Sequence, residues 1–228
     1  MAMRKDRWVW IVLVAMLFAL FVNFLVSPDD QTLGPSVRIF YFHMGAAAMA
    51  GLAFTVTFVA SMGYLATKQL KWDVWAASSA EIGTVFTTMV LVTGILWGKA
   101  SWGVWWTWDP RLTATAILWV LFAGYLFLRE ATDNPTRRAQ LSSLLAILGY
   151  VDVPVDYMTI HWWNSIHPIV ITSQGFRMSP AMVLAMFGSM VAFLGIYVSW
   201  MAIRMRLMRA EMGILEIKDR VRAQLENY

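Results

Sequence analysis

Long apolar runs separated by short polar segments dominate the pattern of residues along this chain. An apolar run of roughly 18 or more residues with few charges predicts a transmembrane helix. The chain has six such runs, at residues 8–26, 37–66, 74–97, 112–128, 139–157 and 180–203. The pattern therefore predicts an all-α polytopic membrane protein, a bundle of six transmembrane helices.

Two of the six runs have features of their own. MRKDR before the first run is typical of a secretory signal peptide. No small-x-small cleavage site follows it, and the turn-rich segment SPDDQTLGPS comes next, so we expect a retained span. The fifth run contains Asp152, Pro154 and Asp156, which predict an interruption of its helix.

Composition agrees with a membrane protein. The 228 residues are 59% hydrophobic and 14% charged, whereas soluble domains are about 45–50% apolar and about 25% charged. The chain has no cysteine. Disulfides, thiolate metal centres and cysteine nucleophiles are therefore excluded from this chain.

The basic residues are distributed unevenly between the two sides of the predicted bundle. With the N-terminus inside, fourteen of the eighteen Lys and Arg residues fall on the inner side. The four on the outer side are Arg38, Lys99, Arg111 and Arg177. Cytoplasmic segments of membrane proteins carry the excess of Lys and Arg. We expect both termini in the cytoplasm. The same uneven distribution explains the net charge of +4 without a nucleic-acid partner, and membrane lipid is the expected surrounding.

The segment after the sixth run has a different pattern. Residues 1–203 form the predicted six-helix domain, and residues 204–228 a cytoplasmic amphipathic tail helix. The apolar positions recur every three or four residues; they are Ile203, Leu207, Ala210, Ile214, Ile217, Val221 and Leu225. We favour a helix on the membrane surface, with a docking helix for a cytoplasmic partner as the alternative.

Tryptophans are concentrated in residues 98–111, which we call the tryptophan loop. They are Trp102, Trp105, Trp106 and Trp108. The WDPRLT sequence that follows indicates a helix start, with Asp109 as N-cap and Pro110 at the first helical position. Two interpretations stay open: an aromatic belt at the headgroup level, or a platform for a large planar ligand.

All three histidines fall in the outer half of the predicted bundle: His43, His161 and His167. His43 lies about six residues inside its span, roughly 9 Å deep, and an ionisable residue there indicates a functional site. The alternative is a histidine hydrogen-bonded within the bundle. His161 and His167 are six residues apart and would not share a helix face, so we expect one of them not to be a ligand. A two-histidine site would pair His43 with either, and the alternative for each is an ordinary loop histidine. Imidazole is a common ligand of haem iron.

Charged residues near these histidines suggest further roles. Arg38 and Arg111 suit the two carboxylates of haem, although lipid headgroups would explain them too. Asp152 and Asp156 are spaced i, i+4 and repel each other. We expect them to line a polar surface or to pair with arginines, and a proton relay is the less favoured role.

WGVWWTWDPRLT resembles the tryptophan-rich WWD motif of the haem-handling proteins of cytochrome c maturation (system I). Within that group the length, the six spans, RIFYFH at the second span and HWWNSIH after the fifth resemble the CcmC family. The resemblance covers about residues 8–203 and leaves out the tail.

The resemblance implies a protein that binds haem b at the outer, periplasmic face of the bacterial inner membrane. It implies His43 and His167 as axial iron ligands, and a haem platform formed by the tryptophan loop. It also assigns cofactor-binding positions to Arg38, Asp109 and Arg111.

The implied partners are the haem chaperone CcmE, the small membrane protein CcmD and the ABC-type subunits CcmA and CcmB. The chain would present haem to the chaperone and would not act as a classical enzyme. Two features depart from the family pattern. The pattern has no histidine at the position of His161, and it has a glutamine after His167, where this chain continues HPIVI.

Two alternatives remain from the sequence. A chaperone-independent cytochrome c haem synthetase would use more histidines than the three found here. A permease or export subunit of an ABC-type complex would place Asp152 and Asp156 along a transport path. The chain has neither paired broken helices in matching halves nor a P-loop, so any ATP hydrolysis belongs to a partner.

Overall fold

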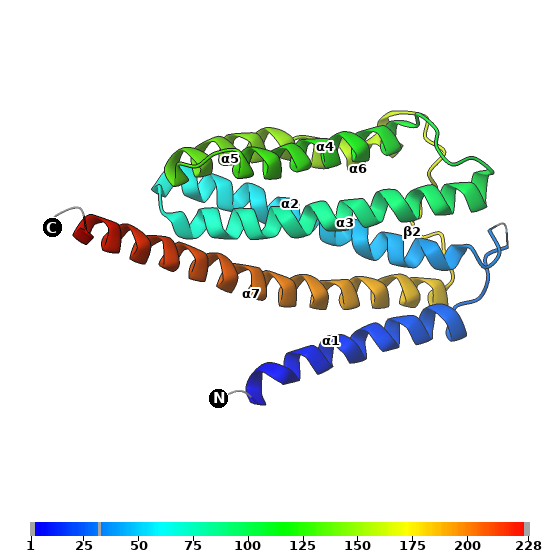
Figure 1. Ribbon diagram of the computed structural model, residues 1–228. Helices are drawn as coiled ribbons and strands as arrows, with labels where there is room; N and C mark the ends of the chain where they lie inside the picture. Colours follow the sequence, from blue (N-terminus) through cyan, green and yellow to red (C-terminus); the bar gives the residue numbers. More distant parts are fainter. Residues whose placement is uncertain (1–2, 32, 226–228) are drawn as a thin grey trace.

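The computed structural model describes residues 3–31 and 33–225, and almost all of the regular structure in them is helical (Figure 1). The elements are α1 (Met3–Phe21), the π-helical turn η1 (Val22–Val26), α2 (Val37–Thr67), α3 (Leu70–Trp102), α4 (Pro110–Glu130), α5 (Pro135–Tyr150), α6 (Asp152–Trp162), β1 (Ile171–Thr172), β2 (Gly175–Phe176) and α7 (Pro180–Leu225). The two strands form one short antiparallel hairpin.

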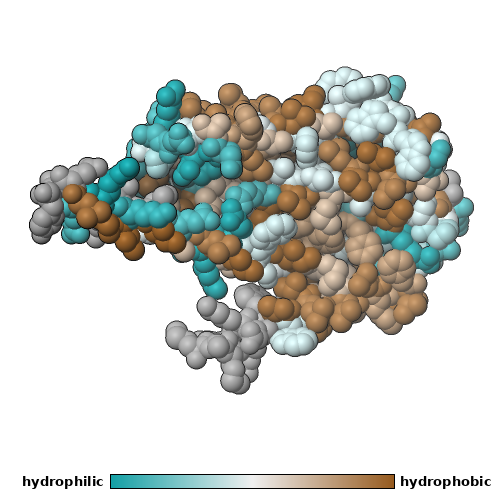
Figure 2. Space-filling model, viewed as in Figure 1, coloured by the Kyte–Doolittle hydropathy of each residue, from teal (hydrophilic) through white to brown (hydrophobic). Residues whose placement is uncertain are grey.

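Six helical segments are long and apolar enough to cross a membrane. They are Val9–Val26, Val37–Thr67, Leu70–Trp102, Pro110–Glu130, Pro135–Trp162 and Pro180–Ile214. The prediction of a six-helix polytopic membrane protein is therefore confirmed. Figure 2 shows brown, hydrophobic side chains along the sides of the bundle, where lipid would contact them.

The fifth span is interrupted, as its sequence predicted. It consists of α5 and α6, which meet at Val151. Pro154 has no N–H to donate to the carbonyl of Tyr150, so the α-helical hydrogen-bond ladder is broken at this point. At the junction of the two helices, the N–H of Val151 donates to the carbonyl of Leu148 at 3.3 Å, three residues back rather than four.

The centre of the bundle is the close pair of α2 and α3. Gly83 of α3 faces Phe54 of α2, and a Cβ added at Gly83 would lie 2.7 Å from that ring. Phe54 in turn stacks on Phe122 of α4, with ring centroids 3.8 Å apart. Helices α4, α5 and α6 pack on one side of this pair, α7 packs on the other, and α1 contacts α7 (Figure 1).

Helix α7 continues without a break from the sixth predicted span into the predicted tail, as far as Leu225. Ile214, Ile217 and Leu225 are exposed on this extension, and residues 226–228 lie outside the described part of the chain. Teal, hydrophilic side chains gather at this end of the bundle (Figure 2).

Two ion pairs connect helices near the same end. Arg129 of α4 donates to both carboxylate oxygens of Asp73 on α3, at 2.6 and 3.0 Å. Arg204 of α7 donates to Glu81 of α3.

The connections that carry the candidate chemistry gather at the opposite end. Residues 27–31, 33–36, 103–109 and 163–179 all lie there, while α1 begins and α7 ends at the other end (Figure 1). Helix α3 runs to Trp102, five residues beyond the predicted end of its span, because Gly103 ends it in a left-handed conformation at φ 76°. Trp102 is therefore part of a helix, and the other three tryptophans precede α4.

Candidate functional site

His43 of α2 is oriented by a hydroxyl on the neighbouring helix. Its Nδ1 lies 3.0 Å from Oγ1 of Thr93 on α3. The Thr93 hydroxyl donates its own hydrogen to the carbonyl of Met89 at 2.6 Å, so it accepts from the Nδ1–H of His43. The hydrogen-bond network thus assigns the proton to Nδ1 and leaves Nε2 of His43 free to bind a metal.

Gly94 gives the His43 ring its space. A Cβ added at Gly94 would lie 3.3 Å from Cε1 of His43, tighter than ordinary van der Waals contact. A larger residue at this position would displace the imidazole.

His167 is oriented in the same way by a carboxylate. Its Nδ1 lies 3.2 Å from Oδ1 of Asp109, and its side chain is only 13% exposed. Nε2 of His167 is therefore the nitrogen left free. A histidine that binds a metal commonly donates its other ring N–H to a carboxylate or another fixed acceptor, which sets the tautomer and strengthens the ligand.

Asp109 joins two segments that are far apart in the sequence. Its carboxylate accepts the backbone N–H of Arg111 at 3.0 Å, which confirms the predicted N-cap of α4. It also accepts the N–H of Ile166 at 2.9 Å and the hydroxyl of Ser165 at 3.1 Å. One buried carboxylate therefore fastens residues 165–167 to the start of α4.

Burial alters the pKa of both members of this pair. Burial raises the pKa of Asp109, but its hydrogen bonds lower it further than burial raises it, so the net pKa lies below its usual value. Burial and the nearby Arg111 lower the pKa of His167 to about 4, against the opposing effect of Asp109. His167 is therefore neutral near pH 7, which is the form that binds a metal.

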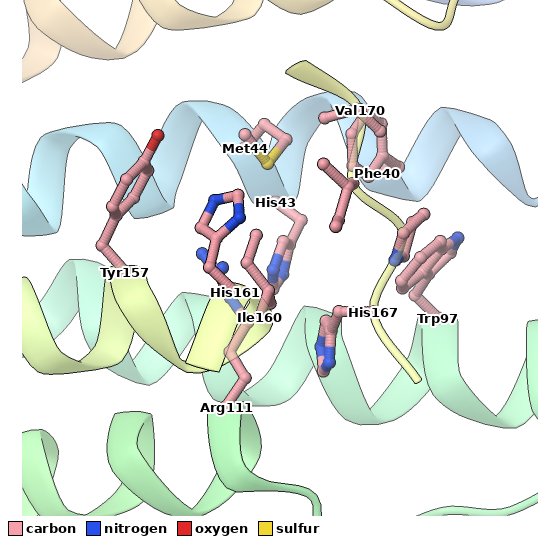
Figure 3. A pocket seen from close by; sticks show the side chains of 12 residues that line it. Phe40, His43, Met44, Trp97, Arg111, Tyr157, Ile160, His161, His167 and Val170 are labelled. Atoms are coloured by element: carbon pink, nitrogen blue, oxygen red, sulfur yellow. The ribbon is translucent and has the colours of Figure 1, made fainter. Parts of the chain in front are cut away.

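His43, His167 and Arg111 line one cavity, shown in Figure 3. Its volume is about 610 Å³ when the open space at its mouth is included. All three histidines and Arg111 line it, with apolar walls from α2, α3, α6 and residues 168–170. The lining residues are Phe40, His43, Met44, Trp97, Arg111, Tyr157, Ile160, His161, His167, Pro168, Ile169 and Val170.

His43 and His167 thus come from segments 124 residues apart and reach the same cavity, each with Nε2 free. Among the described residues, no group of three or more His, Asp or Glu side chains could hold a bare metal ion. Two imidazoles suit a metal that brings other ligands of its own, as the iron of haem does.

The four tryptophans of the tryptophan loop occupy different environments. The Trp102 ring lies 5.2 Å from the His167 ring, edge to face, and 5.0 Å from Trp97. Trp105 and Trp108 are exposed, by 58% and 82%. Trp106 is half-buried and meets Trp108 at 5.9 Å. None of the four is among the described residues that line the cavity.

The two predicted cationic positions also differ. Arg111 lines the cavity and forms no ion pair with another described residue. Arg38 pairs with Asp29 at 2.8 Å and is absent from the described lining. Asp156 accepts a hydrogen bond from Thr115 at 3.1 Å. It lines a smaller adjoining cavity together with Arg111, His43 and His167.

Sequence reasoning missed three residues of this site. Thr93 is one of several hydroxyl residues within an apolar run, and Trp97 was assigned to the end of a span. Ser165, in the segment HWWNSIH, gave no signal of its hydrogen bond to Asp109. Only the tertiary contacts reveal their roles.

One protein family matches most of the chain. The family CcmC, described as Heme exporter protein C, matches residues 1–221. The chain is similar to Heme exporter protein C of Bradyrhizobium diazoefficiens, with 35% identity over 164 residues. That match covers 72% of this chain and 58% of the relative, so the chain spans less than two thirds of that protein's length.

Two further relatives give a similar result. Heme exporter protein C of Paracoccus denitrificans is 32% identical over 184 residues, covering 79% of this chain and 76% of the relative. The protein of the same name from Escherichia coli K12 is 34% identical over 165 residues, covering 70% and 60%.

Proposed function

This chain belongs to the CcmC, heme exporter protein C, family, and on that premise we propose that it binds haem b at the periplasmic face of the bacterial inner membrane. It presents this haem to the chaperone CcmE for cytochrome c maturation. Its further partners are CcmD, CcmA and CcmB. The covalent attachment takes place on the chaperone, and this chain acts as the haem-presenting partner.

One observation carries the proposal. His43 and His167 line the same cavity, and each uses Nδ1 in a hydrogen bond to a fixed oxygen, 3.0 Å from Thr93 and 3.2 Å from Asp109. Both Nε2 atoms are thereby left for the two axial positions of the haem iron. The hydrogen bonds at Nδ1 already give each imidazole the tautomer that binds a metal through Nε2.

The remaining surroundings suit the rest of the haem molecule. Arg111 lines the cavity without an ion-pair partner among the described residues, and it supplies a cation for a propionate. Phe40, Trp97 and Ile160 give apolar surface for the porphyrin. Trp105 and Trp108 extend apolar, exposed rings at the same end of the bundle, where they provide a surface on which the haem edge and the chaperone meet.

The test is the absorption spectrum of the purified protein after haem titration. The wild type should show a Soret band of haem with two imidazole ligands. His43→Ala should lose most of the haem, and His167→Ala should lower the occupancy or shift the band. His161→Ala is the matched control, because it removes an imidazole from the same cavity and should leave the resting spectrum unchanged. A wild-type protein that takes up no haem would refute the proposal.

A further inference from the structure

The cavity contains a third imidazole that the resting ligand pair does not use. His161 lies in the last turn of α6, and its side chain lines the same cavity as His43, His167 and Arg111. Figure 3 shows its ring turned into the space that also holds the His43 ring.

His161 differs from the other two histidines in how its ring is held. The Nδ1 atoms of His43 and His167 are fixed by hydrogen bonds at 3.0 and 3.2 Å. The contact found for the His161 ring is with Tyr157, at a centroid distance of 6.1 Å. No hydrogen bond from another described residue fixes either of its ring nitrogens, so the ring can rotate about its side-chain bonds.

The exposure of the two outer histidines also differs. His167 is nearly enclosed, whereas His161 is exposed and also lines the cavity. A ligand that leaves the cavity toward a soluble partner passes from the enclosed imidazole to the exposed one. Arg111 lines the same cavity, so its contact with a propionate can persist while the iron ligand changes.

From this arrangement, and resting on the proposed function, we propose that His161 is a relay ligand, which replaces His167 on the haem iron as haem leaves for its acceptor. The bond between iron and Nε2 of His167 breaks, and a bond between iron and a ring nitrogen of His161 forms. The iron keeps its oxidation state. His161 restores a second imidazole ligand after His167 has left, so the haem held by His43 alone is short-lived inside the cavity.

The first test asks whether His161 can reach the iron. In ferric His167→Ala, the haem that remains bound should still be low-spin with two imidazole ligands, as judged by electron paramagnetic resonance. The double variant His161→Ala/His167→Ala should be high-spin and five-coordinate. A high-spin His167→Ala protein, with the same spectrum as the double variant, would overturn the relay.

The second test uses a variant that keeps both resting ligands. Haem-loaded His161→Ala should keep the wild-type Soret band but lose haem to excess apomyoglobin about tenfold more slowly, the scale of effect typical of residues that support a metal site. Asn164→Ala, an exposed change in the same segment outside the described cavity lining, should transfer haem at the wild-type rate. An unchanged rate for His161→Ala would overturn the relay even if His167→Ala does not fold.

The two proposals fail in different ways. A wild-type protein that never acquires a Soret band contradicts haem binding itself. A wild-type protein that binds haem through two imidazoles, while His161→Ala transfers it normally, contradicts only the relay.

Discussion

At the scale of single residues, Asp109 combines a local role with a distant one. Locally it caps α4 by accepting the N–H of Arg111. Over a separation of 58 residues it also fixes the ring of His167. The first role follows from the sequence WDPRLT alone. The second depends on how residues 163–170 return to the start of α4, and nothing in the local pattern predicts it.

Asp109→Ala should therefore weaken haem binding more than it weakens the fold. Loss of the N-cap costs about 1 kcal/mol, whereas loss of a carboxylate that orients a ligating histidine typically lowers metal affinity about 10–100-fold. Haem affinity would be measured by titration and stability by thermal unfolding in detergent.

Asn134→Ala is the matched control for this change. Asn134 caps α5 by accepting the N–H of Arg137 at 2.9 Å, in the loop between α4 and α5 at the other end of the bundle. It should cost the stability of one N-cap, about 1 kcal/mol, and leave haem affinity unchanged. An equal loss of affinity in both variants would mean that Asp109 acts only through the fold.

At the scale of helices, the fit of α2 against α3 sets the position of His43. Gly83 and Gly94 let α3 approach the Phe54 ring and the His43 ring. Gly83→Ala would place a methyl group 2.7 Å from Phe54, which is itself stacked on Phe122 and has little room to move. We expect a loss of about 1–3 kcal/mol, the usual cost of overpacking a core, measured as a lower unfolding temperature.

Gly124→Ala tests whether this loss comes from packing. Gly124 lies within α4, and a Cβ there would meet nothing within 4 Å. Its unfolding temperature should equal or slightly exceed that of the wild type, because Ala is favoured over Gly inside a helix by about 0.5–1 kcal/mol. Equal losses at both glycines would contradict the packing explanation.

Helix boundaries show where sequence reasoning was adequate and where it was not. Pro154 predicted the interruption of the fifth span because a proline removes a backbone donor wherever it lies. The predicted end of the third span, Trp97, lies five residues before the end of α3. The apolar run stops at Trp97, whereas the helix continues until the backbone turns at Gly103. Hydropathy indicates which residues lie in the membrane, whereas the ends of a helix depend on backbone conformation and capping.

At the scale of the whole molecule, the two ends of the bundle differ in chemistry. The histidine cavity and the exposed tryptophans lie at one end, and the ion pairs Asp73–Arg129 and Glu81–Arg204 connect helices toward the other. The sequence predicted this division from its uneven Lys and Arg distribution and from the positions of the histidines. The residues alone left open whether His161 or His167 pairs with His43. The structure shows that Asp109, at the start of α4, fixes His167 in the cavity that His43 also lines.

The orientation of the bundle in the membrane can be tested directly because the chain has no cysteine. Ser173→Cys places a unique thiol in the exposed hairpin turn between β1 and β2, and Asp133→Cys places one in the exposed loop between α4 and α5. One complete span, Pro135–Trp162, separates the two positions, so they must lie on opposite sides. With both termini in the cytoplasm, a membrane-impermeant maleimide should label Ser173→Cys in intact spheroplasts and label Asp133→Cys only after permeabilisation. The reverse pattern would place the histidine cavity on the cytoplasmic side, where it could not present haem to a periplasmic chaperone.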